Sequence, residues 1–307
     1  MAAKAKCDAI LMIGFGGPTR ADEVRPFLDN VLRGRPIPRE RYQEVVHHYD
    51  LLGGRSPYND LTMRQAAALR AELEKKGTRM QVAVGMRNWQ PYVADSMRRL
   101  ANGGARRVLG FIMAAHRSEA SFGRYQATVN DALAALGEAA PEVVYPETWH
   151  DHPLFTTAVA SRAREAYSRL EFPERSRARL IFTAHSIPLA MAQAGPYVEQ
   201  LTESARIVAA ELGIDTWQFA YQSRSGSPRD AWLEPDIKET LRNLDAKTAL
   251  VVPIGFLCDH VEVLYDLDIE AAQVARDAGI RMERAPTVGD HPLFIEMMAS
   301  IVAAYAR

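Results

Sequence analysis

Short apolar segments alternate with longer amphipathic ones along all 307 residues, and this alternation constrains the fold most strongly. The short segments are typical of strands and the longer ones of helices. The run TALVVPIGF (248–256) is apolar almost throughout, which indicates a strand covered on both faces of its sheet. Strand–helix–strand alternation predicts an α/β protein with mostly parallel sheets. The expected strands are Ala9–Phe15, Gln81–Met86, Arg107–Met113, Val143–Tyr145, Leu180–Ala184, Trp217–Tyr221, Thr248–Ile254 and Ile280–Arg284; the expected helices include Asp60–Lys76, Tyr92–Asn102, Phe122–Leu136, Leu154–Leu170, Tyr197–Leu212 and Asp236–Asn243.

A repeated pentapeptide favours an internal duplication. DHPLF occurs at Asp151–Phe155 and again at Asp290–Phe294. We expect each copy to open a helix, with Asp as the N-cap and Pro in the first turn. The chain is therefore predicted to consist of two similar α/β halves, the first ending near residue 148.

Composition excludes several classes of protein. The 37 basic and 38 acidic residues leave a net charge of −1, so no overall basic field argues for nucleic-acid binding. No segment approaches the ~20 apolar residues of a membrane span, and the apolar N-terminal run is typical of a first strand rather than of a signal peptide. Cys7 and Cys258 lie far apart and outside any CxxC pattern, which fits a reducing cytoplasm and excludes a cluster held by four cysteines of one chain.

In open α/β sheets ligands bind at the carboxyl ends of the strands, so the residues there are the candidates for a site. The turn GFGGPT at 14–19 has Thr19 where a dinucleotide motif needs a third glycine. A turn that lets the backbone approach a flat ligand is the favoured reading. FTAHSIP brings His185 to another strand end, and the absence of a GxSxG motif argues against a serine hydrolase.

Three carboxylates follow the most apolar strand at intervals of four residues: Glu262, Asp266 and Glu270. On a helix they share one face and repel each other, and the sequence places no Lys or Arg three or four residues from any of them. Such a stripe is either a solvated helix face or a site or path for cations. A histidine and a carboxylate facing each other would bind a divalent metal loosely or hand on protons. Without a closed ligand set such as HExxH, the pattern indicates passage of a metal rather than permanent binding.

Together these motifs resemble the ferrochelatase family. The resemblance implies insertion of Fe²⁺ into a porphyrin in haem biosynthesis, a lyase reaction that releases two pyrrole protons. It also implies two Rossmann-like domains, residues 1–148 and 149–307, with an active-site cleft between them and with the C-terminal helix (290–307) able to pack back on the first. The matching segments are GGP (16–18), RGR (33–35), GGRSP (53–57), GMRNWQP (85–91), AHRS (115–118), TAHSIP (183–188), GPYVEQ (195–200), YQSRSG (221–226), WLEPD (232–236) and PIGFLCDHVEVLYDLDIE (253–270).

The resemblance also implies roles for individual residues. His185 and Glu262 match the pair at the porphyrin centre that delivers the metal and takes up protons. The resemblance leaves open which of the two delivers the metal and which takes up the protons. Asp266 and Glu270 match acids that continue as a second cation site, on a helix with a π-type bulge. The residues expected to bind the porphyrin are Phe15, Arg33, Arg35, Ser56, Trp89, His116, Arg117, Ser118, Tyr125 and Trp232.

Departures from the family pattern bear on the substrate. Phe15 stands where compact members often have Tyr, and AGPY (194–197) stands for the common GDPY. The short form without a C-terminal cysteine extension resembles enzymes of coproporphyrin III, which we favour over protoporphyrin IX, with the RGR and GGRSP segments holding the extra propionates. Fe²⁺ is then a substrate, and neither a permanent cofactor nor an iron–sulfur cluster is expected. We expect a cytoplasmic protein, with transient contacts to haem-pathway enzymes or a membrane surface left open.

Two other functions would each require a different pattern. A chelatase for another metal and tetrapyrrole would put two histidines at the centre, whereas here a single TAHSIP is matched with Glu262. A non-catalytic porphyrin or haem carrier would have no need of Asp266 and Glu270 behind Glu262.

Overall fold

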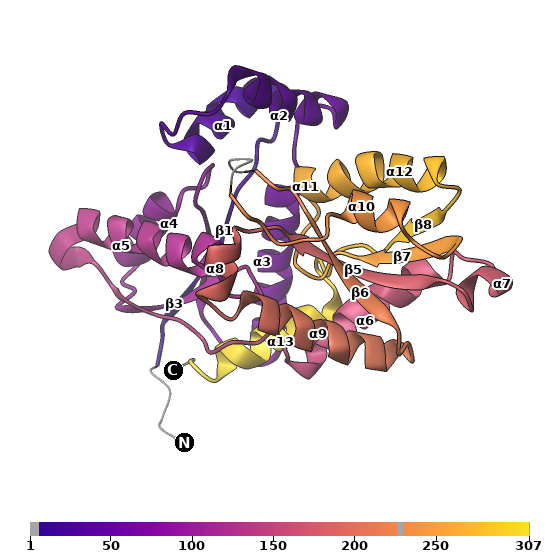
Figure 1. The fold of residues 1–307 in the computed structure, drawn as a ribbon. Coiled ribbons are helices and arrows are strands. Elements are labelled where there is room, and N and C mark those ends of the chain that lie inside the picture. The colour runs from indigo at the N-terminus through magenta and orange to yellow at the C-terminus, as the bar shows by residue number, and fades with distance from the viewer. Residues whose placement is uncertain (1–5, 226–229, 307) are drawn as a thin grey trace. The chain divides into compact units, whose positions relative to one another are not determined.

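The computed structural model describes residues 6–225 and 230–306, so Gly226 of the YQSRSG motif lies outside the described part (Figure 1). Contacts divide the chain into two compact units. The first contains the chain up to Met113, Ser121–Glu147 and the chain from Phe294 onward; the second contains Ala114–Ala120 and Thr148–Leu293. None of the helices in the described part is long and apolar enough to cross a membrane.

The first unit is built on a parallel sheet with strand order β2-β1-β3-β4. Its central strand, β1, is buried at every position, as expected for a strand covered on both faces. Helix α4 packs on β1 and β2, and α3 on β2. The backbone amide of Cys7 donates to the carbonyl of Tyr305 (2.6 Å), which ties the end of the chain to this unit. The elements are β1 (Ala9–Gly14), α1 (Val24–Leu32), α2 (Arg39–Leu51), α3 (Tyr58–Lys75), β2 (Gln81–Met86), α4 (Val93–Asn102), β3 (Arg107–Ile112), a π turn (Glu119–Gly123), α5 (Arg124–Leu136), β4 (Glu142–Val144) and α13 (Pro292–Ala303).

The second unit repeats this sheet in the order β6-β5-β7-β8, again all parallel. Helix α10 packs on β6, and α6 packs on β7 and β8. The predicted α/β class with parallel sheets is thus confirmed. The elements are α6 (Pro153–Tyr167), α7 (Phe172–Arg175), β5 (Arg179–His185), α8 (Leu189–Gln193), α9 (Tyr197–Leu212), β6 (Trp217–Gln222), α10 (Ile237–Arg242), β7 (Thr248–Val252), α11 (Val261–Leu264), a π turn (Asp266–Ala271), α12 (Ala272–Asp277) and β8 (Arg281–Arg284).

The caps of the two DHPLF helices differ from the expectation. The N-cap of α6 is His152 rather than Asp151, and its Nδ1 accepts a hydrogen bond from the Leu154 amide (3.2 Å). His291 Nδ1 accepts from the Leu293 amide in the same way (3.3 Å). The prediction of Asp as the cap was therefore wrong. An imidazole nitrogen can satisfy a free amide of the first turn as a carboxylate does.

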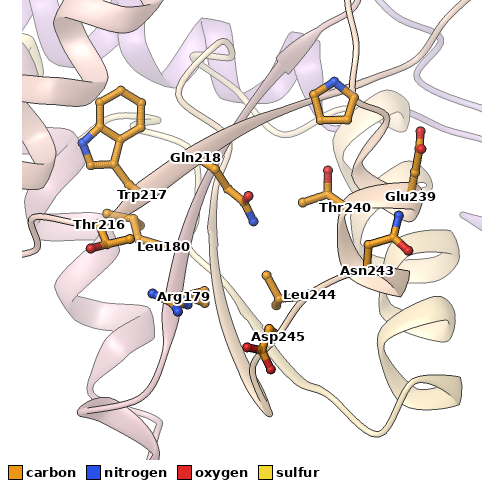
Figure 2. Close-up of a pocket in the computed structure, with 11 residues that line it drawn as sticks. Arg179, Leu180, Thr216, Trp217, Gln218, Glu239, Thr240, Asn243, Leu244 and Asp245 are labelled. Carbon is orange, nitrogen blue, oxygen red and sulfur yellow. The ribbon is translucent and has the colours of Figure 1, made fainter.

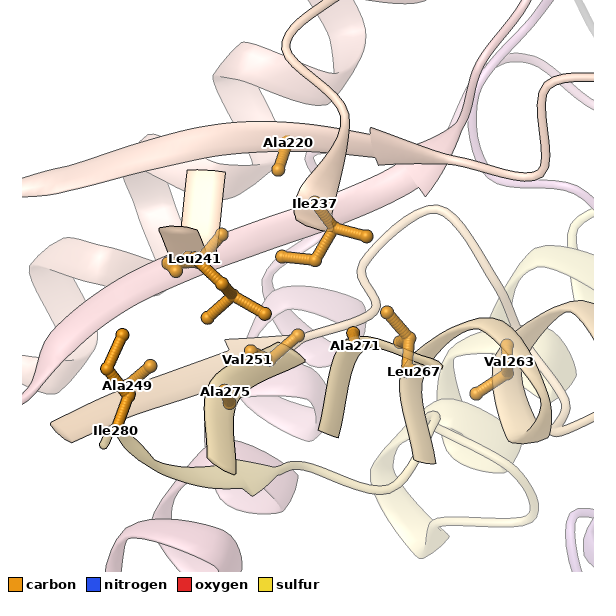
Figure 3. Close-up of a cluster of buried hydrophobic side chains, with 11 residues drawn as sticks. Ala220, Ile237, Leu241, Ala249, Val251, Val263, Leu267, Ala271, Ala275 and Ile280 are labelled. Atoms are coloured by element: carbon orange, nitrogen blue, oxygen red, sulfur yellow. The ribbon is translucent and has the colours of Figure 1, made fainter. Parts of the chain in front are cut away.

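The helix that carries the acid stripe is held to its sheet by an apolar stripe beside it (Figure 3). Val263, Leu267, Ala271 and Ala275 are fully buried, in one cluster with residues of β5, β6, β7 and α10. In an α-helix each step of four residues drifts sideways by about 40°. The π turn, whose hydrogen bonds span five residues, turns the chain less per residue and offsets part of that drift. Each of the three acids directly precedes a buried residue of this stripe, so packing keeps the carboxylates in line.

Candidate active site

His185 and Glu262 lie together at the carboxyl ends of β5 and β7. His185 is the last residue of β5, and Glu262 lies in the first turn of α11, after β7. His185 Nδ1 lies 3.2 Å from Glu262 Oε2, and His260 Nε2 lies 3.4 Å from the same oxygen. The side chains of His185 and Glu262 remain 27% and 36% exposed, so a ligand can reach them. Two imidazoles around one carboxylate form a set that can bind a divalent metal or exchange protons.

Main-chain contacts hold this pair in place. The Tyr197 hydroxyl donates to the carbonyl of His185 (3.0 Å). Gln222, at the end of the neighbouring strand β6, donates from Nε2 to the carbonyl of Glu262 (2.5 Å). Its own carbonyl accepts from the Ser186 amide (2.8 Å). Gln222 therefore links the segment after β5 to the start of α11, which fixes the separation of His185 and Glu262.

The charge of Glu262 is set by its histidine neighbours. Burial alone would raise the pKa of this carboxyl, but the attraction of His185 and the contacts with His185 and His260 outweigh burial and lower the pKa well below its usual range. Glu262 is therefore ionised at neutral pH and attracts cations.

Further along the stripe, the two remaining acids have different partners. Asp266 accepts a hydrogen bond from the Ser223 hydroxyl. Burial raises the pKa of Asp266 to about 7, helped by the charges of Glu262 and Glu270 and opposed by Ser223. Glu270 Oε2 lies 3.0 Å from Lys238 Nζ, a basic partner from α10 that the local spacing along the sequence did not reveal.

The first unit contains a cluster of guanidinium groups centred on Arg87, just after β2. Burial, together with the charges of Arg33, Arg124 and Arg35, lowers the pKa of Arg87 to about 10. The Arg33 guanidinium donates to the carbonyl of Arg87 (3.4 Å). The Arg87 guanidinium donates to Asn88 Oδ1 (3.1 Å). Within the described part of the chain no carboxylate pairs with these four arginines, so the cluster is suited to anions.

Aromatic side chains of the first unit pack beside the glycine turn after β1. Phe15 and Trp89 both contact the buried Phe27 edge-on, with ring centroids 6.2 and 6.1 Å apart. Gly16 has φ +89°, and a Cβ there would lie 3.0 Å from the Trp89 amide nitrogen, so the close approach requires glycine. The turn therefore brings backbone and aromatic rings together. Ser56 and Tyr125 are also buried in this unit.

Four of the residues expected to bind the porphyrin belong to the second unit. His116 and Ser118 are buried, and His116 Nε2 lies 3.0 Å from Ser204 Oγ. The Arg117 amide donates to Gln200 Oε1 (2.8 Å). Trp232 is 9% exposed. The guanidinium carbon of Arg224 lies over the Trp232 ring, 6.0 Å from the ring centroid.

A pocket in the second unit opens at the opposite end of the same sheet (Figure 2). Arg179 and Trp217, at the starts of β5 and β6, line it together with residues of α10 such as Thr240. His185 and Gln222 mark the other ends of these two strands. In parallel sheets the chemistry lies at the carboxyl ends, so this pocket is separate from the candidate site.

Solved structures with a similar fold are metal chelatases. The sirohydrochlorin chelatase SirB from Bacillus subtilis in complex with cobalt matches with a TM-score of 0.59 at 13% identity, over 97% of this chain and 94% of that one. CbiX, the terminal enzyme of sirohaem biosynthesis in denitrifying bacteria, matches with a TM-score of 0.55 at 13% identity, over 97% of this chain and 100% of that one. The fold is thus that of the metal chelatases.

Sequence relatives narrow the class to one family. The ferrochelatase family model matches residues 7–306. A ferrochelatase of Rhodopirellula baltica is 40% identical over 96% of this chain and 85% of its own length. A coproporphyrin III ferrochelatase of Mycolicibacterium smegmatis is 40% identical over 96% of this chain and 88% of its own. The chain belongs to the ferrochelatase family, the chelatases that insert iron in haem biosynthesis.

Two residues beside the candidate site were not among the site residues proposed from the sequence: His260 and Lys238. His260 ends the segment CDH, two residues before Glu262. This closeness to a candidate acid is the sequence feature that could have indicated His260 as a site residue. Lys238 gave no signal, because only packing of α10 on the stripe helix brings it to Glu270.

Proposed function

We propose that this chain inserts Fe²⁺ into coproporphyrin III, with His185 and Glu262 at the centre of the reaction. The observation that carries the proposal is the convergence of His185 Nδ1 and His260 Nε2 on one oxygen of Glu262, at 3.2 and 3.4 Å. A histidine–carboxylate pair with open positions suits a metal that arrives and leaves.

In the reaction, the porphyrin loses two pyrrole N–H protons and its four nitrogens take up one Fe²⁺. Ionised Glu262 attracts the incoming cation, and the imidazole of His185 offers a nitrogen as ligand or as proton acceptor. Which of the two receives the first proton is left open. A site that favours a porphyrin bent toward the metal would lower the barrier by binding the transition state better than the flat ring.

The acid stripe supplies the route for cations and protons in this proposal. Three carboxylates in line attract a hydrated divalent ion, and a carboxyl with a pKa of about 7, such as Asp266, can both take and release protons at neutral pH. Lys238 neutralises Glu270 at the far end of the stripe. An arriving cation must therefore compete with this ammonium group.

The arginine cluster of the first unit supports the choice of porphyrin. Arg33, Arg35, Arg87 and Arg124 repel one another, so carboxylates placed among them would be bound strongly. Four propionates can relieve more of this repulsion than two, which favours coproporphyrin III over protoporphyrin IX. Several relatives are coproporphyrin III ferrochelatases by name. We place the reaction in the cytoplasm, in keeping with two buried cysteines that form no disulfide within the described residues.

The decisive experiment is anaerobic insertion of Fe²⁺, followed by porphyrin absorption, with coproporphyrin III and protoporphyrin IX in parallel. We expect turnover of the first and little of the second. Turnover of protoporphyrin IX alone would overturn the substrate assignment. Tight porphyrin binding without insertion into either would overturn catalysis and favour a carrier.

A further inference from the structure

A second group of metal-ligating side chains lies outside the candidate active site, where the loop before α6 meets α9. His150 and Asp151 come from the loop, and Glu203 comes from α9. One donor atom from each of the three lies within 4.8 Å of the other two. We propose that His150 and Asp151 bind a divalent transition-metal ion through His150 Nδ1, with Glu203 holding the imidazole from Nε2.

The imidazole of His150 is the feature that distinguishes this group from a cluster of surface acids. His150 is only 7% exposed. Its Nε2 lies 3.0 Å from Glu203 Oε2, which orients the ring. Its Nδ1 is buried and has no hydrogen-bond partner within the described residues, and the nearest charged oxygen is Asp151 Oδ1, 4.0 Å away. A buried nitrogen without a partner costs free energy, and a metal ion beside it would remove that cost.

The surroundings hold the ring but leave the carboxylates mobile. The Ser204 hydroxyl donates to the carbonyl of His150 (2.7 Å) and fixes the backbone at this point. The side chains of Asp151 and Glu203 are 51% and 44% exposed, so they can rotate and water can complete the coordination. Ligands of a tetrahedral ion with bonds of about 2.0–2.1 Å lie roughly 3.3 Å apart. The present separation of 4.0 Å between His150 Nδ1 and Asp151 Oδ1 needs only a small side-chain movement to reach that value.

The donor set indicates the kind of ion. One imidazole nitrogen with carboxylate oxygens suits ions of intermediate softness, such as Zn²⁺, Co²⁺ or Fe²⁺, better than Mg²⁺ or Ca²⁺. A carboxylate that accepts from the other ring nitrogen of a metal-binding histidine is the usual arrangement, because it fixes the ring and raises its basicity. With the ion on Nδ1, Glu203 is placed to act in this way on Nε2, and this role requires its charge.

The test uses Co²⁺, whose visible absorption reports its coordination, in the full chain with His185→Ala and Glu262→Ala to remove the proposed active-site ligands. We expect this chain to bind about one equivalent of Co²⁺ and to lose at least about tenfold in affinity when Asp151→Asn and Glu203→Gln are added. Glu199→Gln, an exposed acid one turn earlier on α9, is the matched control and should change the affinity less than twofold.

No Co²⁺ binding in the background chain, or equal affinity with and without the two amide substitutions, would overturn the site. His150→Ala gives a second test of Co²⁺ affinity, since it removes the imidazole nitrogen and leaves both acids. Iron insertion is assayed separately in the otherwise wild-type chain carrying Asp151→Asn and Glu203→Gln. Failure of the proposed porphyrin chemistry is thereby distinguished from failure of this metal site.

Discussion

The ends of β1 and β5 occupy the same place in their two sheets but carry different chemistry. Gly14 pairs with Met86 as Ala184 pairs with Tyr221. The Met86 amide donates to the Pro91 carbonyl, and the Tyr221 amide donates to the Pro235 carbonyl in the same way. The next residue is Phe15 in the first unit and His185 in the second. One framework thus presents an aromatic ring at one strand end and an imidazole at the other.

The segments after the third strand of each half continue the contrast. Both contain a π turn, Glu119–Gly123 before α5 and Asp266–Ala271 before α12. The first leads to Arg124, part of the arginine cluster; the second carries Asp266 and Glu270. A duplicated framework with opposite charges can therefore serve an anionic ring and a cationic metal separately, which a single set of charges could not.

The largest expected effect distinguishes the two strand ends. His185→Ala or Glu262→Ala should lower kcat for iron insertion by about 10²–10⁴, because each removes a metal ligand or proton acceptor. Phe15→Ala, at the equivalent position, should lower kcat less than about tenfold. Steady-state kinetics with porphyrin binding followed by fluorescence quenching would test this. Wild-type turnover by His185→Ala would break the comparison.

Next in size is the role of the arginine cluster. Replacing Arg33 and Arg35 with Met should raise KM for coproporphyrin III by about tenfold, because charge-assisted contacts to propionates are lost. KM for protoporphyrin IX should rise less. Arg39→Met, an exposed residue at the start of α2, is the control. Equal changes for both porphyrins would show that the cluster does not select by propionate number.

A third effect concerns the buried histidine after β3. Burial, with a smaller contribution from His150, lowers the pKa of His116 from its ordinary 6.5 to about 3. Below about pH 6.5 this histidine binds a proton in the unfolded chain but not in the folded chain. The free energy of unfolding therefore falls as the pH drops from about 6.5 toward 3, by up to ~1.4 kcal/mol per pH unit. His116→Gln should flatten this slope in urea unfolding between about pH 7 and pH 5. An unchanged slope would show that His116 titrates normally.

The smallest effect is expected at Lys238. Lys238→Met leaves Glu270 without its ammonium partner and should lower the KM for Fe²⁺ by about two- to fivefold, the range expected of a partly exposed ion pair. Lys247→Met, on the loop before β7, controls for the loss of one positive charge. A higher KM for Fe²⁺ would mean that Lys238 orders the stripe rather than competing with the metal.

Strand positions were predictable to within one or two residues, because near-continuous apolar runs depend on local composition. The helices α1 and α2 were not expected. Most residues of α2 are polar, and only Val46 and Tyr49 of this helix are buried. The π turn at Glu119–Gly123 was missed for a similar reason, since no local residue pattern marks hydrogen bonds that span five residues.

The sequence by itself determined the α/β class, the duplicated plan, the family and the acids that follow β7, because periodicity, repeats and motifs are properties of neighbouring residues. Only the tertiary structure decided which charges meet. His260 joins His185 at Glu262, Lys238 neutralises Glu270, and His150 faces Glu203. These pairs lie between two and more than 70 residues apart, and packing of the helices on the sheet, rather than spacing along the chain, brings most of them within bonding distance.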